Sequence, residues 1–274
     1  AILVLGPYDR HAKLLRQALN IDISTRRGNL RISGEDESVQ EARRRVEHLL
    51  GKRLPAGVPV AWMDVELHNS PKKLLVTLQE WLDALPEPSV VLLGYGLCGN
   101  GLAGLKAGRH TLVVPRTHDC VAIFLGSHQR YLQRFMASPN TYYLTKGWID
   151  AKDEPLSDYL AYVRDYDEET ADYLVEMKYK HYRKLCMVGF SQEELDGCRP
   201  AAMRVADFCR ERFGMEYEET IGTTDLIEAL VRMTERVDTG DSEFVVVPPG
   251  GEITTEMFMR PGEGAPQPMG RGES

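Results

Sequence analysis

Two histidines and two cysteines each come soon after an apolar, strand-like segment of the sequence. They are His68, Cys98, His118 and Cys120. In open α/β sheets the loops that follow parallel strands meet at one edge and bind ligands there, so we expect these four side chains to share that edge. Thiolate and imidazole groups are good ligands for zinc and other transition metals. The four residues are therefore a candidate metal site, for which zinc is the first choice.

Other chemistry is open to the same loops, because the spacing of His118 and Cys120 matches no standard zinc motif. Either thiol could act as a nucleophile if backbone N–H groups at a helix start, together with Arg116 or His118, stabilise its thiolate. Asp119 could orient an imidazole or act as an acid or base. A purely structural interpretation is that Cys98 and Cys120 pack in the core and His118 is hydrogen-bonded within a turn. The residue types leave these alternatives open, with Arg116 and Asp119 as the catalytic candidates.

The loop at residues 94–101 is rich in glycine and satisfies the pattern G-x-G-x-x-G after a strand. A dinucleotide-binding fold also needs a good helix next and an acidic residue at the end of the following strand. Here we expect only a short helix at residues 102–107, and the following strand ends in Pro115 and Arg116. The glycines are better explained by positive φ angles or by a backbone that approaches a ligand closely. The candidate ligand-binding residues are Gly94, Gly96, Gly99, Asn100 and Gly101.

The elements that must position these loops alternate between strand and helix. Short apolar runs, typical of buried strands, predict strands at residues 60–67, 89–93, 111–114, 185–190 and 244–247. Apolar residues at helical spacing predict helices at residues 71–82, 121–125, 131–136, 200–213 and 224–236. The alternation indicates an α/β domain at residues 58–251, an open, mostly parallel sheet with flanking helices, with the turn at residues 248–251 beside the same pocket. Residues 252–274 lose this periodicity, which predicts a loose tail.

Residues 1–54 predict a smaller βαββα unit that precedes this domain. Val4 and Leu5 end its first strand, and two short alternating segments, residues 21–23 and 30–32, flank a turn-forming Arg26-Arg27-Gly28-Asn29 and indicate a hairpin. Residues 1–56 carry 11 Lys and Arg against 7 Asp and Glu, although the whole chain has a net charge of −8. This uneven charge suggests that the two units have different partners.

The first unit resembles the small KH-like N-terminal module of PhoH-type proteins over about residues 2–52. The segments GPYDRH (6–11) and RGNLRISG (27–34), with the helix that follows them, carry the resemblance. It implies a role in binding single-stranded RNA. The G-x-x-G clamp of KH domains and the P-loop that follows in PhoH-type proteins are missing from the sequence. The alternative is a basic surface without a ligand.

Residues from about 62 to 250 resemble the uncharacterised family catalogued as domain of unknown function 1638, from bacteria and archaea. The segments that carry this resemblance are LHN (67–69), LLGYGLCGNG (92–101), PRTHDC (115–120), YYLT (142–145), GW (147–148) and VVPPG (246–250). The resemblance implies no established reaction, but it implies an association with corrinoid-dependent methyl-transfer systems. The family usually opens with its own strand and helix, a place that residues 1–54 occupy here. Residues 1–5 then either join the main sheet or belong to a fused unit, or the start is a gene-prediction artefact that leaves the sheet incomplete.

The composition is that of an ordinary globular protein, with 43% apolar and 27% charged residues among 274. Its five cysteines, an odd number at irregular spacing, argue against a disulfide framework and favour the cytoplasm. No apolar run is long enough to cross a bilayer, and the start lacks the features of a signal peptide. The larger unit is too acidic for general nucleic-acid binding.

Three hypotheses follow from the sequence. The first is a metal- or cofactor-binding α/β protein, an enzyme that acts on a small molecule at residues 94–101 and 116–120. The second is an RNA-binding or adaptor protein that acts through residues 1–54. The third is a thiol-dependent transferase without a metal.

Overall fold

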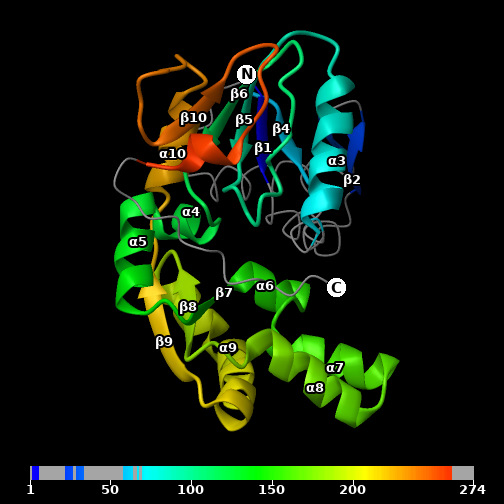
Figure 1. The fold of residues 1–274 in the computed structure, drawn as a ribbon, viewed down its shortest axis with the longest axis vertical. Coiled ribbons are helices and arrows are strands. Elements are labelled where there is room, and N and C mark those ends of the chain that lie inside the picture. Colours follow the sequence, from blue (N-terminus) through cyan, green and yellow to red (C-terminus); the bar gives the residue numbers. More distant parts are fainter. Residues whose placement is uncertain are drawn as a thin grey trace. The chain divides into compact units, whose positions relative to one another are not determined.

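The computed structural model describes the backbones of three N-terminal strands, residues 58–63, Leu67 and residues 70–260. The chain divides into two compact units, which we call unit 1 and unit 2 (Figure 1). Unit 1 comprises Ala1–His128 and Thr224–Pro268, and unit 2 comprises Gln129–Thr223 and Met269–Ser274. Each unit contains its own sheet of mostly parallel strands with helices, so the predicted α/β class is confirmed.

The sheet of unit 1 has five strands in the order β10-β6-β5-β1-β4. They are β1 (Ile2–Leu5), β4 (Val60–Trp62), β5 (Val90–Gly94), β6 (Thr111–Pro115) and β10 (Phe244–Val247). All neighbours pair in parallel except β10, which runs antiparallel to β6. β1 lies between β5 and β4, with Leu5 opposite both Gly94 and Trp62. The first strand of the chain therefore joins the main sheet, one of the arrangements that the sequence left open.

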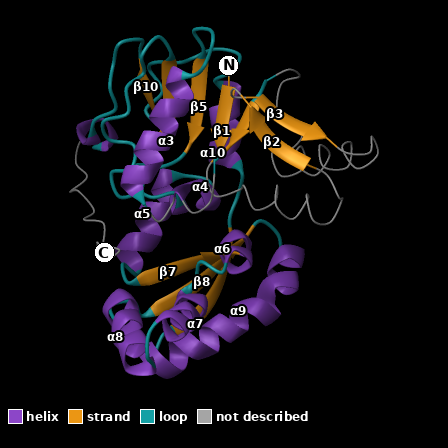
Figure 2. Cartoon of the chain, turned by 90° about the vertical axis from the view of Figure 1, so that its right-hand side faces the viewer, coloured by secondary structure: helices purple, strands orange, loops and turns teal. Residues whose placement is uncertain are grey.

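The predicted hairpin near the N-terminus is present as β2 (Asp22–Arg26) and β3 (Asn29–Ser33) (Figure 2). The two strands pair antiparallel, with Arg26 opposite Asn29. The helices expected within residues 1–54 lie outside the described residues, and so does most of the segment expected to extend β4 as far as residue 67.

Helix α3 (Pro71–Asp83) packs against the core of unit 1. It begins at Pro71, whose fixed φ suits the first turn of a helix, and buries Leu74, Leu78 and Leu82 against the sheet. Two shorter helices, α4 (Val121–Leu125) and α10 (Asp225–Arg232), also belong to this unit. Within the described residues, no helix is both long and apolar enough to cross a membrane.

Residues 252–258 pack against the core of unit 1 instead of forming the loose tail expected there. Glu252 forms a β-bridge with Lys106, and the Ile253 amide donates to the carbonyl of Leu105. A short 3-10 helix, η2 (Thr255–Phe258), follows, and both Ile253 and Phe258 are fully buried. The partner segment, residues 102–107, is a series of turns and not the short helix that we predicted.

Unit 2 contains a three-stranded parallel sheet in the order β7-β8-β9. Its strands are β7 (Thr141–Thr145), β8 (Lys184–Gly189) and β9 (Glu216–Ile221). Its helices are α5 (His128–Ala137), α6 (Lys146–Ala151), α7 (Pro155–Asp165), α8 (Glu168–Tyr179) and α9 (Gln192–Phe213). The prediction of a single sheet was therefore wrong, because β8 pairs with β7 and β9, the strands on either side of it in the sequence.

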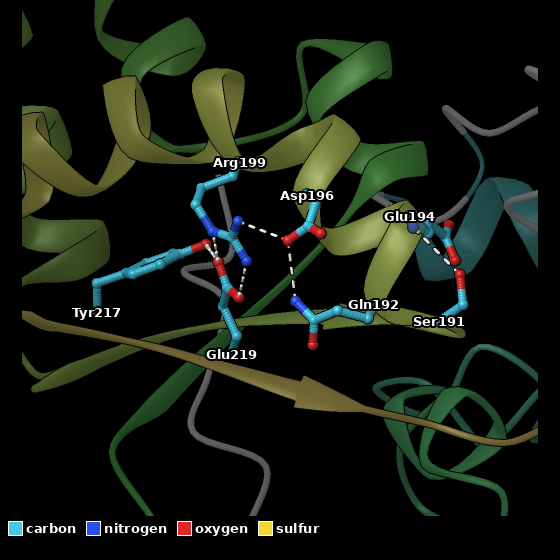
Figure 3. A network of polar contacts seen from close by, with 7 residues as sticks. All are labelled: Ser191, Gln192, Glu194, Asp196, Arg199, Tyr217 and Glu219. Carbon is cyan, nitrogen blue, oxygen red and sulfur yellow. Dashed lines mark hydrogen bonds and ion pairs between the residues drawn. The ribbon is translucent and has the colours of Figure 1, made fainter.

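Helix α9 begins at Gln192, eight residues before the start that we placed at Pro200. Ser191 Oγ accepts a hydrogen bond from the Glu194 amide at 3.1 Å, and the Glu194 carboxylate accepts one from the Phe190 amide at 2.7 Å. This reciprocal capping satisfies amides that the helix itself leaves unpaired. Further along, Arg199 forms a bidentate ion pair with Glu219 on β9 at 2.7 Å for each contact (Figure 3). Both contacts lie before Pro200, so the first part of the helix is fixed next to the sheet.

Candidate functional site

The structure brings together the two loops in which we expected the site. The loop at residues 94–101 leaves β5 and the loop at residues 116–120 leaves β6, at the carboxyl edge of these parallel strands. The amide of Leu97 donates to the carbonyl of Thr117 at 2.8 Å, and the amide of Cys98 donates to the carbonyl of His118 at 3.0 Å. The two loops are therefore joined backbone to backbone.

Gly96 allows this close approach. A Cβ atom at position 96 would lie 2.9 Å from the carbonyl carbon of Asp119 and 3.1 Å from the amide nitrogen of Cys120. Both of these are backbone atoms, which cannot rotate away as a flexible side chain could. Any larger residue at position 96 would push the loops apart, so packing alone is enough to require glycine here.

The tip of the first loop has an unusual backbone. Three consecutive residues have positive φ angles: 46° at Cys98, 61° at Gly99 and 66° at Asn100. The Gly101 amide donates to the Cys98 carbonyl at 3.1 Å and closes this left-handed turn. Glycine and asparagine accept such angles readily, whereas cysteine does so at a cost. Cys98 is also the one cysteine of the five that is partly exposed.

The second loop is held by Asp119, which we had considered as an acid or base. Its Oδ1 accepts a hydrogen bond from the Val121 amide at 2.9 Å, immediately before α4. Cys120 is the residue that precedes the helix, and its side chain is buried. In this geometry the Asp119 carboxylate stabilises the start of α4.

Two buried polar residues, Thr117 and His128, form side-chain contacts that hold this loop, and neither was expected as a site residue. The hydroxyl of the fully buried Thr117 donates to the Asp119 carbonyl at 3.2 Å. Nδ1 of His128, which is 1% exposed, lies 3.2 Å from the same hydroxyl oxygen. The His118 and His128 rings have centroids 6.3 Å apart. Thr117 lies within the predicted loop, but no sequence signal connects His128 to it.

The side chain of Arg116, our other catalytic candidate, is directed to β10. Its Nη2 donates to the Phe244 carbonyl at 3.3 Å, and its amide donates to the Glu243 carbonyl at 2.7 Å. Arg260 pairs with the Glu243 carboxylate at 2.7 Å and donates to the Arg116 carbonyl at 3.1 Å. These contacts fasten β10 and the C-terminal segment to the site loop.

The turn at residues 248–251 lies away from this edge, contrary to our expectation. Because β10 is antiparallel to β6, its end at Val247 lies opposite Leu112, near the start of β6. The Gly250 amide accordingly donates to the Gly108 carbonyl at 2.7 Å. The turn therefore contributes to the opposite edge of the sheet and adds nothing to the candidate site.

The structure places the segments of three of the four candidate metal ligands, but it does not test metal binding. Backbone contacts bring the segments of Cys98 and His118 together, and Cys120 follows in the same loop. His68 lies outside the described residues. In the part of the chain that the structure describes, no three His, Cys, Asp or Glu side chains are grouped so that they could hold a metal ion. Zinc binding therefore stays a prediction.

Residues 62–231 match the model of the family described as Protein of unknown function (DUF1638). No curated protein and no solved structure matches the chain. The family match does not reach the PhoH-like segment at residues 2–52, so that resemblance and the RNA binding that it implies stay predictions. The match covers more than half of the chain and includes both site loops, and the chain therefore belongs to the DUF1638 family.

Proposed function

We propose that unit 1 binds a small molecule at the carboxyl edge of β5 and β6, with the Cys98 sulfur as the group that reacts with the ligand or coordinates a metal that the ligand carries. The observation that carries this proposal is the φ angle of 46° at Cys98. Residues held in such conformations concentrate at binding and catalytic sites, where the surrounding structure offsets their strain.

The argument turns on the residue type at position 98. The left-handed turn continues through Gly99 and Asn100, two residues suited to positive φ. A glycine at position 98 would form the same turn with less strain. A cysteine therefore makes sense there if its thiol contributes something that glycine cannot, and its partial exposure makes that thiol accessible.

The same turn offers hydrogen-bond donors. Gly99 and Asn100 are both exposed. Within the described residues, their amides donate to no protein group. Adjacent amides in a turn of this kind suit an anionic or carbonyl oxygen. The ligand that fits best has an oxygen at these amides and an electrophilic carbon or a metal at the sulfur.

The first experiment compares wild-type protein with Cys98→Ser, both purified without chelator or affinity metal. Native mass spectrometry detects bound small molecules, and elemental analysis detects zinc, iron, nickel and cobalt. We expect the wild type to retain a ligand or metal that Cys98→Ser loses. Cys209→Ser is the matched control, because Cys209 is fully buried in α9 and should leave retention unchanged.

Equal retention by the wild type and Cys98→Ser would contradict the proposal. A wild type without bound ligand or metal, whose Cys98 reacts with iodoacetamide no faster than free cysteine, would also contradict it. The elements found distinguish the two forms of the proposal: a metal lost with Cys98 indicates coordination, and an organic adduct indicates covalent chemistry.

A further inference from the structure

Exposed apolar side chains are concentrated on two neighbouring helices of unit 2. In the described part of the chain, nine large apolar or aromatic side chains are exposed, and five of them lie within residues 160–177. They belong to α7, to α8 and to the turn between them, and the two helices pack on each other as a helical hairpin (Figure 1). We call these five side chains the apolar face: Leu160, Val163, Tyr166, Tyr173 and Met177.

Helix α7 buries very little of itself in unit 2. Of its 11 residues, Pro155 is the one that is fully buried. Leu156, Leu160 and Val163 have the i, i+4, i+7 spacing of a buried stripe, yet Leu160 is 57% exposed and Val163 is 37% exposed. A helix of this length is marginal without tertiary packing of its apolar stripe. The stripe of α7 therefore has the pattern of a surface that packs against something.

Other residues of α7 provide its contacts within unit 2. The Asp158 carboxylate accepts a hydrogen bond from Lys178 Nζ on α8 at 2.6 Å. The Tyr159 ring lies 4.1 Å from the guanidinium of Arg212 on α9. These contacts join α7 to its neighbours and leave the side with Leu160 open.

Helix α8 has a comparable open side. It buries Ala171, Val175 and Tyr179, which recur every four residues along one side. Tyr173 and Met177 each lie two residues from these positions, which in a helix is the opposite side, and both are more than half exposed. The outer side of a surface helix is ordinarily polar. The hairpin therefore presents apolar residues outward from both of its helices.

The charged residues of the hairpin separate toward its two ends. The end at which the helices join has four exposed carboxylates: Asp165, Asp167, Glu168 and Glu169. Arg164 is the exposed cation beside them, and it pairs with Asp165 at 2.8 Å. The end at which α7 begins and α8 stops has three exposed cations: Lys152, Lys180 and Arg183. Glu176 is the exposed carboxylate of α8 nearest to these cations.

We propose that the apolar face is the interface of a symmetric homodimer, in which the α7–α8 hairpins of two copies pack antiparallel. A two-fold interface must be complementary to itself. The antiparallel arrangement meets this requirement, because it places the acidic end of each hairpin against the basic end of the other and the apolar faces between them. A parallel arrangement would oppose like charges. The face belongs to unit 2, so the dimer does not depend on the function proposed for Cys98 in unit 1.

The test is sedimentation velocity of the full chain at concentrations between about 1 and 100 μM, which measures the Kd of a reversible dimer. Leu160→Glu places a charge within the apolar face and should raise this Kd by about thirtyfold or more. Val76→Glu is the matched control: Val76 is 55% exposed on α3 of unit 1, and its replacement should leave the Kd unchanged. Leu160→Ala keeps a good helix former and should raise the Kd by about fivefold, which separates dimerisation from helix formation.

A charge swap tests the antiparallel arrangement. Glu169→Lys and Lys180→Glu should each raise the Kd by about fivefold, because each creates a like-charge contact across the interface. The double variant restores opposite charges and should return the Kd to within about twofold of the wild type.

Three results would overturn the proposal. The first is a monomer at every concentration, whether the apolar face is open or covered by another segment of the same chain. The second is a dimer whose Kd responds equally to Leu160→Glu and Val76→Glu. The third is a double charge variant that is no tighter than either single variant.

Discussion

A Cβ atom on Gly96 would lie 2.9 Å from the carbonyl carbon of Asp119, so these two residues fix the distance between the loops of the candidate site. The contact is between backbones, and the hydrogen bonds from Leu97 to Thr117 and from Cys98 to His118 lie beside it. The position of the Cys98 thiol relative to the second loop therefore depends on the absence of a side chain at position 96.

We predict that Gly96→Ala destabilises the protein by about 1–3 kcal/mol, because the added methyl group forces backbone atoms apart. Urea unfolding measures the change. Gly197→Ala is the matched control: Gly197 lies within α9, and a Cβ atom there meets nothing within 4 Å. That replacement should stabilise its helix by at most about 1 kcal/mol. A Gly96→Ala protein as stable as the wild type would show that the loops are not in contact as described.

The parts of this fold that could be predicted from sequence are those with a local signal. Continuous apolar runs identified β5, β6 and β10, and alternation around a turn-forming segment identified the hairpin β2–β3. Strand β9 has no such signal, because its sequence EYEETI is polar and no residue of it is fully buried. The start of α9 had a signal that we did not use, since Ser191 and Glu194 have the spacing of a capping box.

The candidate site, too, could be predicted only in the parts for which the sequence contains a signal. Its loops could be located because loops after parallel strands meet at one sheet edge. An apolar run does not indicate the direction of its strand, so the sequence did not show that β10 is antiparallel to β6. This direction places the turn at residues 248–251 at the opposite edge of the sheet. The contact between Thr117 and His128 depends on tertiary packing, and no pattern along the chain reports it.

The strain at Cys98 leads to a second prediction. Glycine should be more stable than alanine at position 98, whereas alanine should be more stable than glycine at the control position, Cys120. At φ 46°, glycine is favoured over alanine, so Cys98→Gly should be more stable than Cys98→Ala by about 1 kcal/mol. At Cys120, where φ is −64°, the order should reverse by about 0.5–1 kcal/mol. Urea unfolding of the four variants measures both differences. The same order at both positions would argue against a left-handed conformation at Cys98.

The burial of the cysteines predicts selective labelling. Cys98 is partly exposed, whereas Cys120, Cys186, Cys198 and Cys209 are buried. Burial raises the pKa of Cys186 and of Cys209 to about 12, which further suppresses their thiolates. Iodoacetamide should therefore modify the folded protein at Cys98 first, and all five cysteines only after denaturation. Peptide mass spectrometry identifies the modified residue, and Cys98→Ser should abolish the fast phase. Fast labelling at a buried cysteine instead would contradict the described burial.

The same two buried thiols predict a loss of stability at alkaline pH. The pKa of Cys209 is raised from 9.0 to about 12, first by burial and then by the charge of Glu154. That of Cys186 is raised to about 12, first by burial, with Glu218 raising it and Arg134 lowering it. Between these pH values the unfolded chain has lost a proton that the folded protein keeps. Stability is therefore fully present below about pH 9 and falls as the pH rises toward about 12, by about 1.4 kcal/mol per pH unit for each thiol.

Urea unfolding at several pH values between about 9 and 11 measures this slope. Cys209→Ala should make the slope shallower by about the contribution of one thiol. Equal slopes in the wild type and Cys209→Ala would mean that Cys209 ionises as readily in the folded protein as in the unfolded chain. Such a result would contradict the burial of the Cys209 side chain in unit 2.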